Sequence, residues 1–377
     1  MKTKGKDTKG GAIMAEKKVV RVAVVGLSRG LSIASGLVNN KNATISAVCD
    51  LMPERREAGI NFCKKHGYTD YEVFENYEQV LASDKVDAII LATDATIHTP
   101  MAIQALEAGK HVLSEIPAIH TMEDIKALRA ATDAHPDVKY FCGENCCYWA
   151  FIDTWKTMHE NGQFGDIAYA ESEYHHAMEV IPPDAEEQGM FKTGWRRTLN
   201  AIEYLTHNLG PLLYIMDDRC VSVSCMVPDT VYNPYVSGQE NGIALFKTEK
   251  GAVIRIFIGF GVYVGCDHNF SIYGTKGSSF TENTKHFAEA KTYAKLSSIP
   301  GTDMMPLQMQ MTAKFPGEQS DSHGGADTKM VKDFINCIVN DTKPRVDIDL
   351  AINMALPGLI AVESAKRGGE LMEIPKM

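Results

Sequence analysis

The chain has 377 residues, of which 45% are hydrophobic and 23% charged, which is the composition of a soluble globular protein large enough for two domains. Its formal net charge of -10 at pH 7 argues against a nucleic acid or an anionic membrane surface as its partner. The nine cysteines are odd in number and include no C-x-x-C pair, so we expect reduced thiols in a cytoplasmic protein.

The N-terminal residues 1–17 alternate lysine with threonine and glycine, and their one apolar run, residues 12–15, is too short for the core of a signal peptide. This composition predicts a disordered tail and argues against a signal peptide. We expect no later segment to span a bilayer.

The first predicted strand, residues 19–25, ends in a turn of small residues that includes Gly26, Ser28 and Gly30. A strand, such a turn and a helix in this order can bind a pyrophosphate, because the helix N-terminus offers free N–H groups and a partial positive charge. The G-x-G-x-x-G pattern is imperfect, since Ser28 stands at its second glycine and Gly30 lies one place early. A purely structural strand–helix turn is the alternative.

The second predicted strand, residues 43–49, is followed by an acid, Asp50. Asp50 lies 24 positions after Gly26, a spacing that suits a carboxylate accepting hydrogen bonds from an adenosine ribose. The two features together predict a dinucleotide cofactor, and the acid favours NAD over NADP.

Strand-like and helix-like blocks alternate as far as residue 148, which predicts a parallel sheet of the Rossmann type. After residue 164 the segments alternate apolar with small or polar residues, which predicts a large, mostly antiparallel sheet in a second, α+β domain. Further strands are expected at 86–93, 110–114 and 138–142, then at 167–174, 220–226, 242–246, 252–258 and 268–273. Helices are expected at 53–65, 99–108, from 121 onward, 199–216, 327–340 and 350–367. We assign residues 18–148 to the first domain and 149–377 to the second, and leave open whether the last helices pack back on the first.

Several short motifs, in this order and spacing, resemble the Gfo/Idh/MocA oxidoreductase family over nearly the whole chain. They are the first strand and its turn and the segments 92–98, 108–117 and 206–211. The resemblance implies a nicotinamide cofactor in the first domain and a sugar or polyol substrate presented by the second sheet. The expected cofactor contacts are Gly26, Ser28, Arg29, Gly30, Asp50, Thr93, His98, Glu115, Pro117 and Asn145.

The chain departs from the family at one triplet. The usual Glu-Lys-Pro, whose lysine contacts the reacting hydroxyl, is here Glu115-Ile116-Pro117. A subgroup resembling glycoside hydrolase family 109 shares this loss, and also shares a Trp-Arg pair, a Tyr-x-Thr-His-x-x-Gly-Pro segment and a Glu-Asn-x-x-Tyr segment. That resemblance implies functional roles for Glu115, Tyr148, Tyr204 and His207. From the residues themselves, we expect Trp195, Arg196 and His176 to face the substrate.

Tyr204 and His207 stand three residues apart in a predicted helix and therefore share one face. Histidine titrates near the working pH, whereas a tyrosine base would need its pKa lowered, for example by the nicotinamide cation. A buried histidine bonded to a backbone carbonyl is the alternative for His207, and a hydrophobic anchor is the alternative for Trp195. We expect one of the adjacent His175 and His176 to line the substrate pocket, and we expect no metal site. The methionine-rich stretch 304–311 is expected to be a loop.

We interpret the chain as an NAD-dependent oxidoreductase that removes a hydride from a ring carbon, expected to be C3, of a sugar or glycoside. His207 or a tyrosine would accept the hydroxyl proton. The alternative is a redox-neutral glycosidase, in which oxidation is followed by elimination at C1, addition of water and return of the hydride. A non-catalytic NAD-binding regulator would explain Ile116 but would leave Tyr204 and His207 without a role. We expect a small-molecule substrate and a homo-oligomer.

Overall fold

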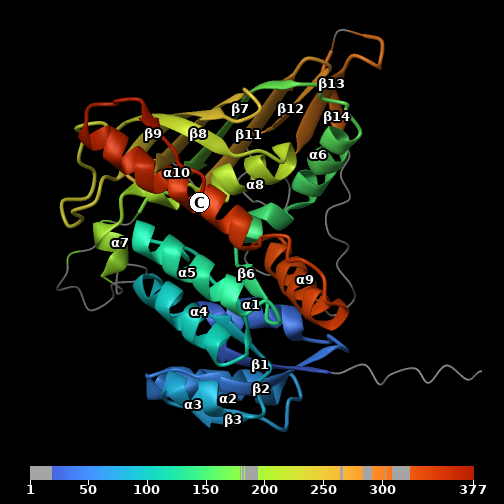
Figure 1. Cartoon of the computed structure of the whole chain (residues 1–377), viewed down its shortest axis with the longest axis vertical. Helices are drawn as coiled ribbons and strands as arrows, with labels where there is room; N and C mark the ends of the chain where they lie inside the picture. The colour runs from blue at the N-terminus through green and yellow to red at the C-terminus, as the bar shows by residue number, and fades with distance from the viewer. Residues whose placement is uncertain are drawn as a thin grey trace, which may run out of the picture.

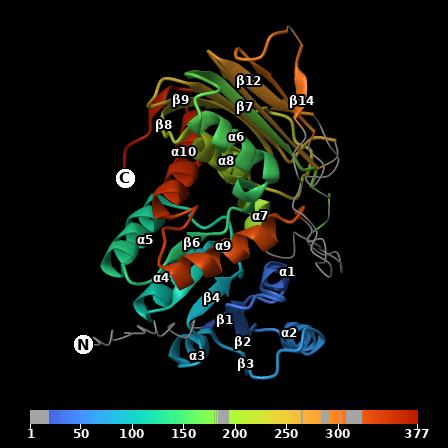
Figure 2. The same cartoon turned by 90° about the vertical axis from the view of Figure 1, so that its right-hand side faces the viewer.

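The computed structural model describes residues 19–178, 180, 182, 194–263, 266–282, 291–301, 303–307 and 323–377. The expected disordered tail, residues 1–17, lies outside the described residues. Figures 1 and 2 show two layers of structure, one around each of two sheets.

The first sheet has six parallel strands in the order β3-β2-β1-β4-β5-β6, which confirms the predicted parallel sheet and adds one strand, β3, that was not predicted. Its central strands β1 and β4 consist of buried apolar residues, apart from the partly exposed Arg21, because helices cover both faces of such a sheet. The strands are β1 (Val20–Val25), β2 (Ala43–Cys49), β3 (Glu72–Phe74), β4 (Ala88–Leu91), β5 (His111–Ser114) and β6 (Tyr140–Cys142). The helices between them are α1 (Arg29–Ala34), α2 (Pro53–Lys65), α3 (Tyr77–Ala82), α4 (His98–Glu107) and α5 (Met122–Ala134), with short 3-10 turns η1 (Ser35–Leu37), η2 (Ala95–Ile97) and η3 (Asn145–Tyr148).

Local signals explain where these helices start. Pro53 occupies the first turn of α2, where its fixed φ suits a helix and its missing N–H costs nothing. Thr121 and Asp124 form a reciprocal capping box at the start of α5.

The second sheet has nine strands in the order β14-β13-β12-β11-β7-β10-β9-β8-β15. Every neighbouring pair is antiparallel except β7 and β10, so the predicted mostly antiparallel sheet is confirmed. The strands are β7 (Ile167–His175), β8 (Cys220–Met226), β9 (Asn241–Thr248), β10 (Val253–Gly259), β11 (Asp267–Gly274), β12 (Gly277–Thr281), β13 (Thr292–Leu296), β14 (Met305–Leu307) and β15 (Met372–Glu373). The other elements are α6 (Ala150–Glu160), α7 (Trp195–Thr198), η5 (Ala201–Tyr204), α8 (Thr206–Met216), α9 (Ala326–Asn340) and α10 (Ile348–Lys366).

Helices lie between the second sheet and the first domain. Along β7, Ala170, Ser172 and Tyr174 are buried while the residues between them are partly exposed, so one face of the sheet points inward. Helix α8 packs on β7 and α10 packs on β8, and Figure 1 shows both helices beneath the sheet. No described helix covers the opposite face in Figures 1 and 2.

The last two helices reach back to the first domain. Helix α9 packs on α1 and η1, and α10 packs on α5 as well as on α8 and β8 (Figure 2). By length and composition, α10 is apolar enough to cross a membrane, contrary to our expectation that no segment would be. Its packing against both α5 and β8 is that of a core helix.

Two further expectations were wrong in detail. The single helix predicted at 199–216 is broken at Leu205 into η5 and α8. Ile202 of η5 packs directly against Gly242 of β9, where an added Cβ would lie 2.8 Å from the Ile202 Cβ. In the methionine-rich stretch, Met305–Leu307 pairs with β13 as the edge strand β14, and residues 308–311 lie outside the described residues.

Candidate active site

A single cleft of about 890 Å³ joins the two domains. The first domain lines it with residues that follow the carboxyl ends of its strands, and the second domain lines it with residues from β7, α7, η5 and α8. This volume lies within the usual range for ligand sites. The predicted site residues that line it are Gly26, Ser28, Arg29, Asp50, Thr93, His98, Glu115, Asn145, His176, Trp195, Arg196, Tyr204 and His207.

Gly26 lets the turn after β1 pack tightly against the backbone that follows β4. This residue has φ of 84°, and a Cβ at its position would lie 2.3 Å from the Ala92 carbonyl oxygen, so no other residue fits. Ser28 lines the cleft just before α1. Gly30 does not line the cleft, and it packs against Val24 instead, where a Cβ would lie 3.0 Å from the valine Cγ1.

Asp50 lies at the end of β2, next to this turn. Its Oδ2 accepts the Leu27 N–H at 2.8 Å and its Oδ1 accepts the Met52 N–H at 3.0 Å, so the carboxylate also fixes the backbone around it. The residue still borders the cleft. The bare Gly26 turn and the adjacent carboxylate fit the pyrophosphate and the ribose of a dinucleotide.

Arg29 is held between two carboxylates. Its Nε donates to Glu115 Oε1 at 2.7 Å, and its Nη1 and Nη2 donate to the two oxygens of Asp327 in α9 at 2.5 and 2.8 Å. Burial alone would lower the pKa of Arg29, but Glu115 and Asp327 outweigh burial and raise it. Asn145 also donates to Asp327, at 2.9 Å, so these residues form one network at the floor of the cleft.

His98 and Pro117 contact each other. His98 Nδ1 lies 2.9 Å from the Pro117 carbonyl oxygen, and burial lowers the pKa of this ring. His98 lines the cleft, but Pro117 does not. The structure therefore places Pro117 behind the cofactor half of the cleft and not in contact with it.

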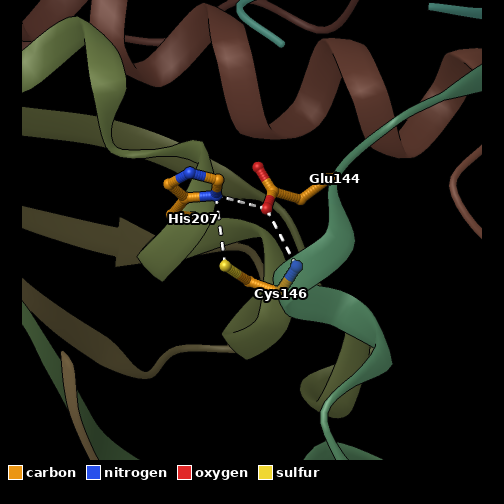
Figure 3. A group of neighbouring side chains, drawn as sticks. All are labelled: Glu144, Cys146 and His207. Atoms are coloured by element: carbon orange, nitrogen blue, oxygen red, sulfur yellow. Dashed lines mark hydrogen bonds and ion pairs between the residues drawn. The ribbon is translucent and has the colours of Figure 1, made fainter. Parts of the chain in front are cut away.

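His207 lies at the start of α8, beside Cys146 of η3 and beside Glu144, which caps η3. Its Nδ1 lies 2.6 Å from Glu144 Oε1 and 3.1 Å from Cys146 Sγ (Figure 3). Glu144 is fully buried, and its Oε1 also accepts the Cys146 N–H at 3.2 Å. The side-chain atoms of these three residues that could bind a metal ion lie within 4.8 Å of one another. The short contacts between the atoms, however, already link them as hydrogen-bond partners.

Aromatic rings surround His207 on the substrate side. Tyr204 and Tyr174 both contact its ring edge-on, with centroids 5.1 and 5.7 Å away. Trp195 stacks on Tyr204 at 6.4 Å, and the Arg196 guanidinium lies 4.3 Å from the Trp195 ring. Flat aromatic faces of this kind can pack on the C–H face of a sugar ring.

The tyrosines in the cleft are protonated. Burial raises the pKa of Tyr204 to about 12, although Arg196 acts in the other direction. Burial also raises the pKa of Tyr174 well above its ordinary value. Both hydroxyls are therefore suited to donate a hydrogen bond, and in this state neither is suited to accept a proton.

Tyr148 is not brought to the cleft. Its hydroxyl donates to Asp333 Oδ2 at 2.7 Å, and the Arg345 guanidinium lies 4.3 Å from its ring. Sequence reasoning overlooked Tyr174 and the carboxylate of Glu144. The alternation along β7 could have identified Tyr174, because it places this side chain on the inward face with Ala170 and Ser172.

Comparisons with known proteins agree with this geometry. The model described as "Oxidoreductase family, NAD-binding Rossmann fold" matches residues 20–142, and the "GFO/IDH/MocA C-terminal domain" model matches residues 152–279. The two matches cover more than half of the chain. The chain belongs to the Gfo/Idh/MocA oxidoreductase family. Its first domain is an NAD-binding Rossmann domain.

Among Gfo/Idh/MocA relatives, the chain is similar to glycosyl hydrolase family 109 protein 4 of Phocaeicola vulgatus, with 28% identity over 93% of this chain and 76% of that protein. It is also similar to an alpha-N-acetylgalactosaminidase of Bacteroides fragilis, with 29% identity over 53% of this chain and 48% of that protein. The resemblance to family 109 is therefore confirmed.

Solved structures of the family share the fold. A levoglucosan dehydrogenase in complex with NADH and L-sorbose superimposes with a TM-score of 0.77 at 17% identity, over 96% of this chain and 100% of that chain. A myo-inositol 2-dehydrogenase from Lactobacillus plantarum gives a TM-score of 0.75 at 20% identity, over 95% of this chain and 100% of that chain.

Within this Gfo/Idh/MocA chain, Ile116 borders the cleft beside Glu115 and is 6% exposed. An aliphatic side chain cannot transfer a proton. Both oxygens of Glu115 are engaged, one by Arg29 and one by the Ile116 N–H at 2.5 Å. His207 is therefore the group in the substrate half that is best placed to accept a proton.

Proposed function

We propose that this protein is an NAD-dependent oxidoreductase that oxidises a ring-carbon hydroxyl, at C3, of a sugar or glycoside. The observation that carries the proposal is that His207 and the Gly26 turn open into the same cleft. When bound, NAD supplies the hydride acceptor. The chain then has to bind the sugar, orient it and take up the hydroxyl proton.

Each of these tasks has a candidate residue. His207 accepts the proton, because its ring lines the cleft and its Nε2 makes no hydrogen bond to a described residue. Tyr204, which is protonated, donates a hydrogen bond to the substrate. Trp195 offers a ring face to the sugar, and Arg196 and His176 offer polar contacts beside it. Glu115 acts indirectly by holding Arg29 at the cofactor turn.

A second candidate function is a redox-neutral glycosidase. The names of the family 109 relatives favour it. Its first step is the same ring oxidation, after which the acidified C2–H is lost with the C1 substituent, water adds and the ketone is reduced again. The residues named above serve either outcome, because both begin with removal of a hydroxyl proton.

One experiment separates the two functions. The protein is incubated with NAD and a panel of glycosides, and NADH and free aglycone are recorded together. NADH without aglycone supports net oxidation, and aglycone without NADH supports the glycosidase. If no glycoside yields either product, both functions are contradicted and a non-catalytic regulator is indicated.

We also propose a reducing compartment and self-association. All nine cysteines lie among the described residues as free thiols, which suits the cytoplasm. The outer face of the second sheet exposes Ile243, Leu245 and Tyr273, and such apolar side chains, on a face that no described helix covers, suit contact with a second copy. Light scattering of the purified protein tests the second proposal, since a monomer would contradict it.

A further inference from the structure

We propose that Glu144 is a positioning residue that makes His207 a proton acceptor by fixing its tautomer. The inference rests on the proposed function, because it gives a reason for His207 to act as the base. Nothing in the comparisons assigns a role to Glu144. Figure 3 shows the arrangement on which the proposal depends: the carboxylate faces one ring nitrogen, and the other nitrogen lies on the far side of the ring.

Glu144 is a buried anion whose polar environment is dominated by His207. Its side chain has 0% exposure. Burial alone would raise its pKa, but the His207 ring and the hydrogen bond from the Cys146 N–H outweigh burial and hold the pKa below the ordinary value. A buried carboxylate that stays ionised needs such a partner.

The ionised carboxylate decides which ring nitrogen carries the proton. A carboxylate can only accept, so at 2.6 Å from Glu144 Oε1 the His207 Nδ1 must donate. In the neutral ring, Nε2 then keeps its lone pair. Nε2 makes no hydrogen bond to any described residue, and His207 lines the cleft, so this lone pair is available to a substrate hydroxyl.

Cys146 does not compete for these roles. Burial raises the pKa of its thiol well above the ordinary value, so the sulfur keeps its proton. Asn145 Oδ1 lies 3.5 Å from Sγ and can accept that proton. The thiol fills space beside Nδ1, and the carboxylate remains the charged partner of the ring.

The other titratable groups that face His207 are neutral. Tyr204 and Tyr174 contact the ring edge-on with phenol pKa values raised by burial. His268 lies 5.9 Å away between ring centroids, and burial, then His207 itself, lower its pKa well below the ordinary value. Burial and Arg196 lower the pKa of His176. Glu144 is therefore the anion in contact with the ring, and it stabilises the imidazolium that forms when Nε2 takes the substrate proton.

The packing around Glu144 keeps it in place. Gly210 lies in α8, one turn after His207, and a Cβ there would lie 2.8 Å from Met354 Sδ and 3.6 Å from Glu144 Cγ. The absence of a side chain lets α8 approach Met354 of α10 closely, while the backbone of Gly210 stays near the Glu144 side chain. The carboxylate thus has little freedom to leave Nδ1.

The test compares Glu144→Gln with Glu144→Asp in the full-length protein. The amide of Gln can donate to Nδ1, which favours a ring protonated at Nε2 and unable to accept. We expect Glu144→Gln to lower kcat by about 10²- to 10⁴-fold with little change in KM, the scale of a lost general base. Removal of the carboxylate should also move the acidic limb of the kcat/KM profile to lower pH. Glu144→Asp keeps the charge and should recover part of the activity.

A matched control is Glu203→Gln. Glu203 is a half-buried acid in η5 that accepts a hydrogen bond from Asn200 at 2.7 Å and does not line the cleft. Its loss should leave kcat and the pH profile unchanged. Circular dichroism checks that each variant is folded.

A second readout does not depend on turnover. Nitrogen-15 NMR of labelled histidine should show His207 protonated at Nδ1 in the unmodified protein and at Nε2 in Glu144→Gln. A ring protonated at Nε2 in the unmodified protein would overturn the proposal, as would Glu144→Gln with normal kcat and pH profile. If no glycoside is turned over at all, the proposed function fails, and the NMR result alone still decides whether Glu144 fixes the tautomer.

Discussion

Arg29 and Asp327 lie 298 positions apart in the chain and form a two-point ion pair. Arg29 follows the cofactor turn of the first domain, and Asp327 lies in the first turn of α9, near the end of the chain. The Asp327 side chain is fully buried. The pair therefore ties α9 to the turn that shapes the cofactor half of the cleft.

Replacement of Asp327 by Asn should destabilise the protein. The change leaves the Arg29 guanidinium with one carboxylate fewer in a partly buried position, and breaking a buried ion pair costs about 3–5 kcal/mol. Urea denaturation at pH 7 measures the free energy of unfolding. The exposed Asp341→Asn at the end of α9 is the control and should leave that free energy nearly unchanged.

The same pair predicts a pH dependence. Burial alone would raise the pKa of Asp327, but Arg29 and His323 hold it well below the ordinary value. The unfolded chain therefore takes up a proton on this carboxyl at a higher pH than the folded chain does. Stability from Asp327 is complete above the unfolded pKa of about 3.9 and is lost as pH falls below it. If the free energy of unfolding falls as steeply with decreasing pH in Asp327→Asn as in the unmodified protein, this assignment is contradicted.

Asp50→Ala should remove the preference for NAD over NADP. The carboxylate borders the cleft at the end of β2, where it would bind a ribose diol and repel a 2′-phosphate. Arg55 Nη1 lies 3.9 Å from Asp50 Oδ2 and would then face the phosphate without an acid beside it. Calorimetric titration with both cofactors measures the change, and Glu54→Ala controls for loss of a nearby charge. Equal affinity of the unmodified protein for NAD and NADP would show that Asp50 has another role.

His207→Ala should lower turnover by about 10²- to 10⁴-fold, the usual contribution of a positioned base. NAD affinity should not change, because His207 belongs to the substrate half of the cleft. Steady-state kinetics and calorimetry measure the two effects. A variant with near-normal turnover and an unaltered pH profile would make His207 a structural residue.

Two Tyr→Phe variants should behave differently. Tyr204→Phe removes a hydroxyl from a ring that lines the cleft and should lower turnover. Tyr148→Phe removes the donor to Asp333, outside the cleft, and should cost stability of about 1.5–3 kcal/mol with turnover retained. Kinetics and thermal denaturation of both variants provide the comparison. Loss of turnover in a folded, cofactor-binding Tyr148→Phe would return this tyrosine to the list of candidate proton carriers.

Ile116→Ala should change substrate fit modestly and retain most of the turnover. The side chain borders the cleft but has no proton to move, and its truncation removes buried apolar contacts worth about 2 kcal/mol. KM, kcat and the midpoint of thermal unfolding are measured together. A loss of turnover by many orders of magnitude, with NAD binding intact, would mean that this loop contributes chemistry that its composition does not suggest.

The sequence alone determined most of the first domain. The buried runs of β1 and β2, the Gly26 turn and Asp50 depend on contacts between near neighbours and between adjacent strands. Strand periodicity and turn chemistry report such contacts directly. The sequence likewise identified the loss of the family lysine at Ile116 and the proximity of Tyr204 to His207, although the helix between them proved to be broken at Leu205.

Tertiary structure decided the rest of the candidate site. The positions of Glu144, Tyr174 and Asp327 relative to the cleft depend on how η3, β7 and α9 pack together, and their separation along the chain carries no such information. Long-range packing also places Tyr148 outside the cleft, because its hydrogen-bond partner Asp333 lies 185 positions away in the chain. A residue's type and local pattern predict which chemistry it can perform, but only long-range packing sets which groups it meets and whether water can reach it.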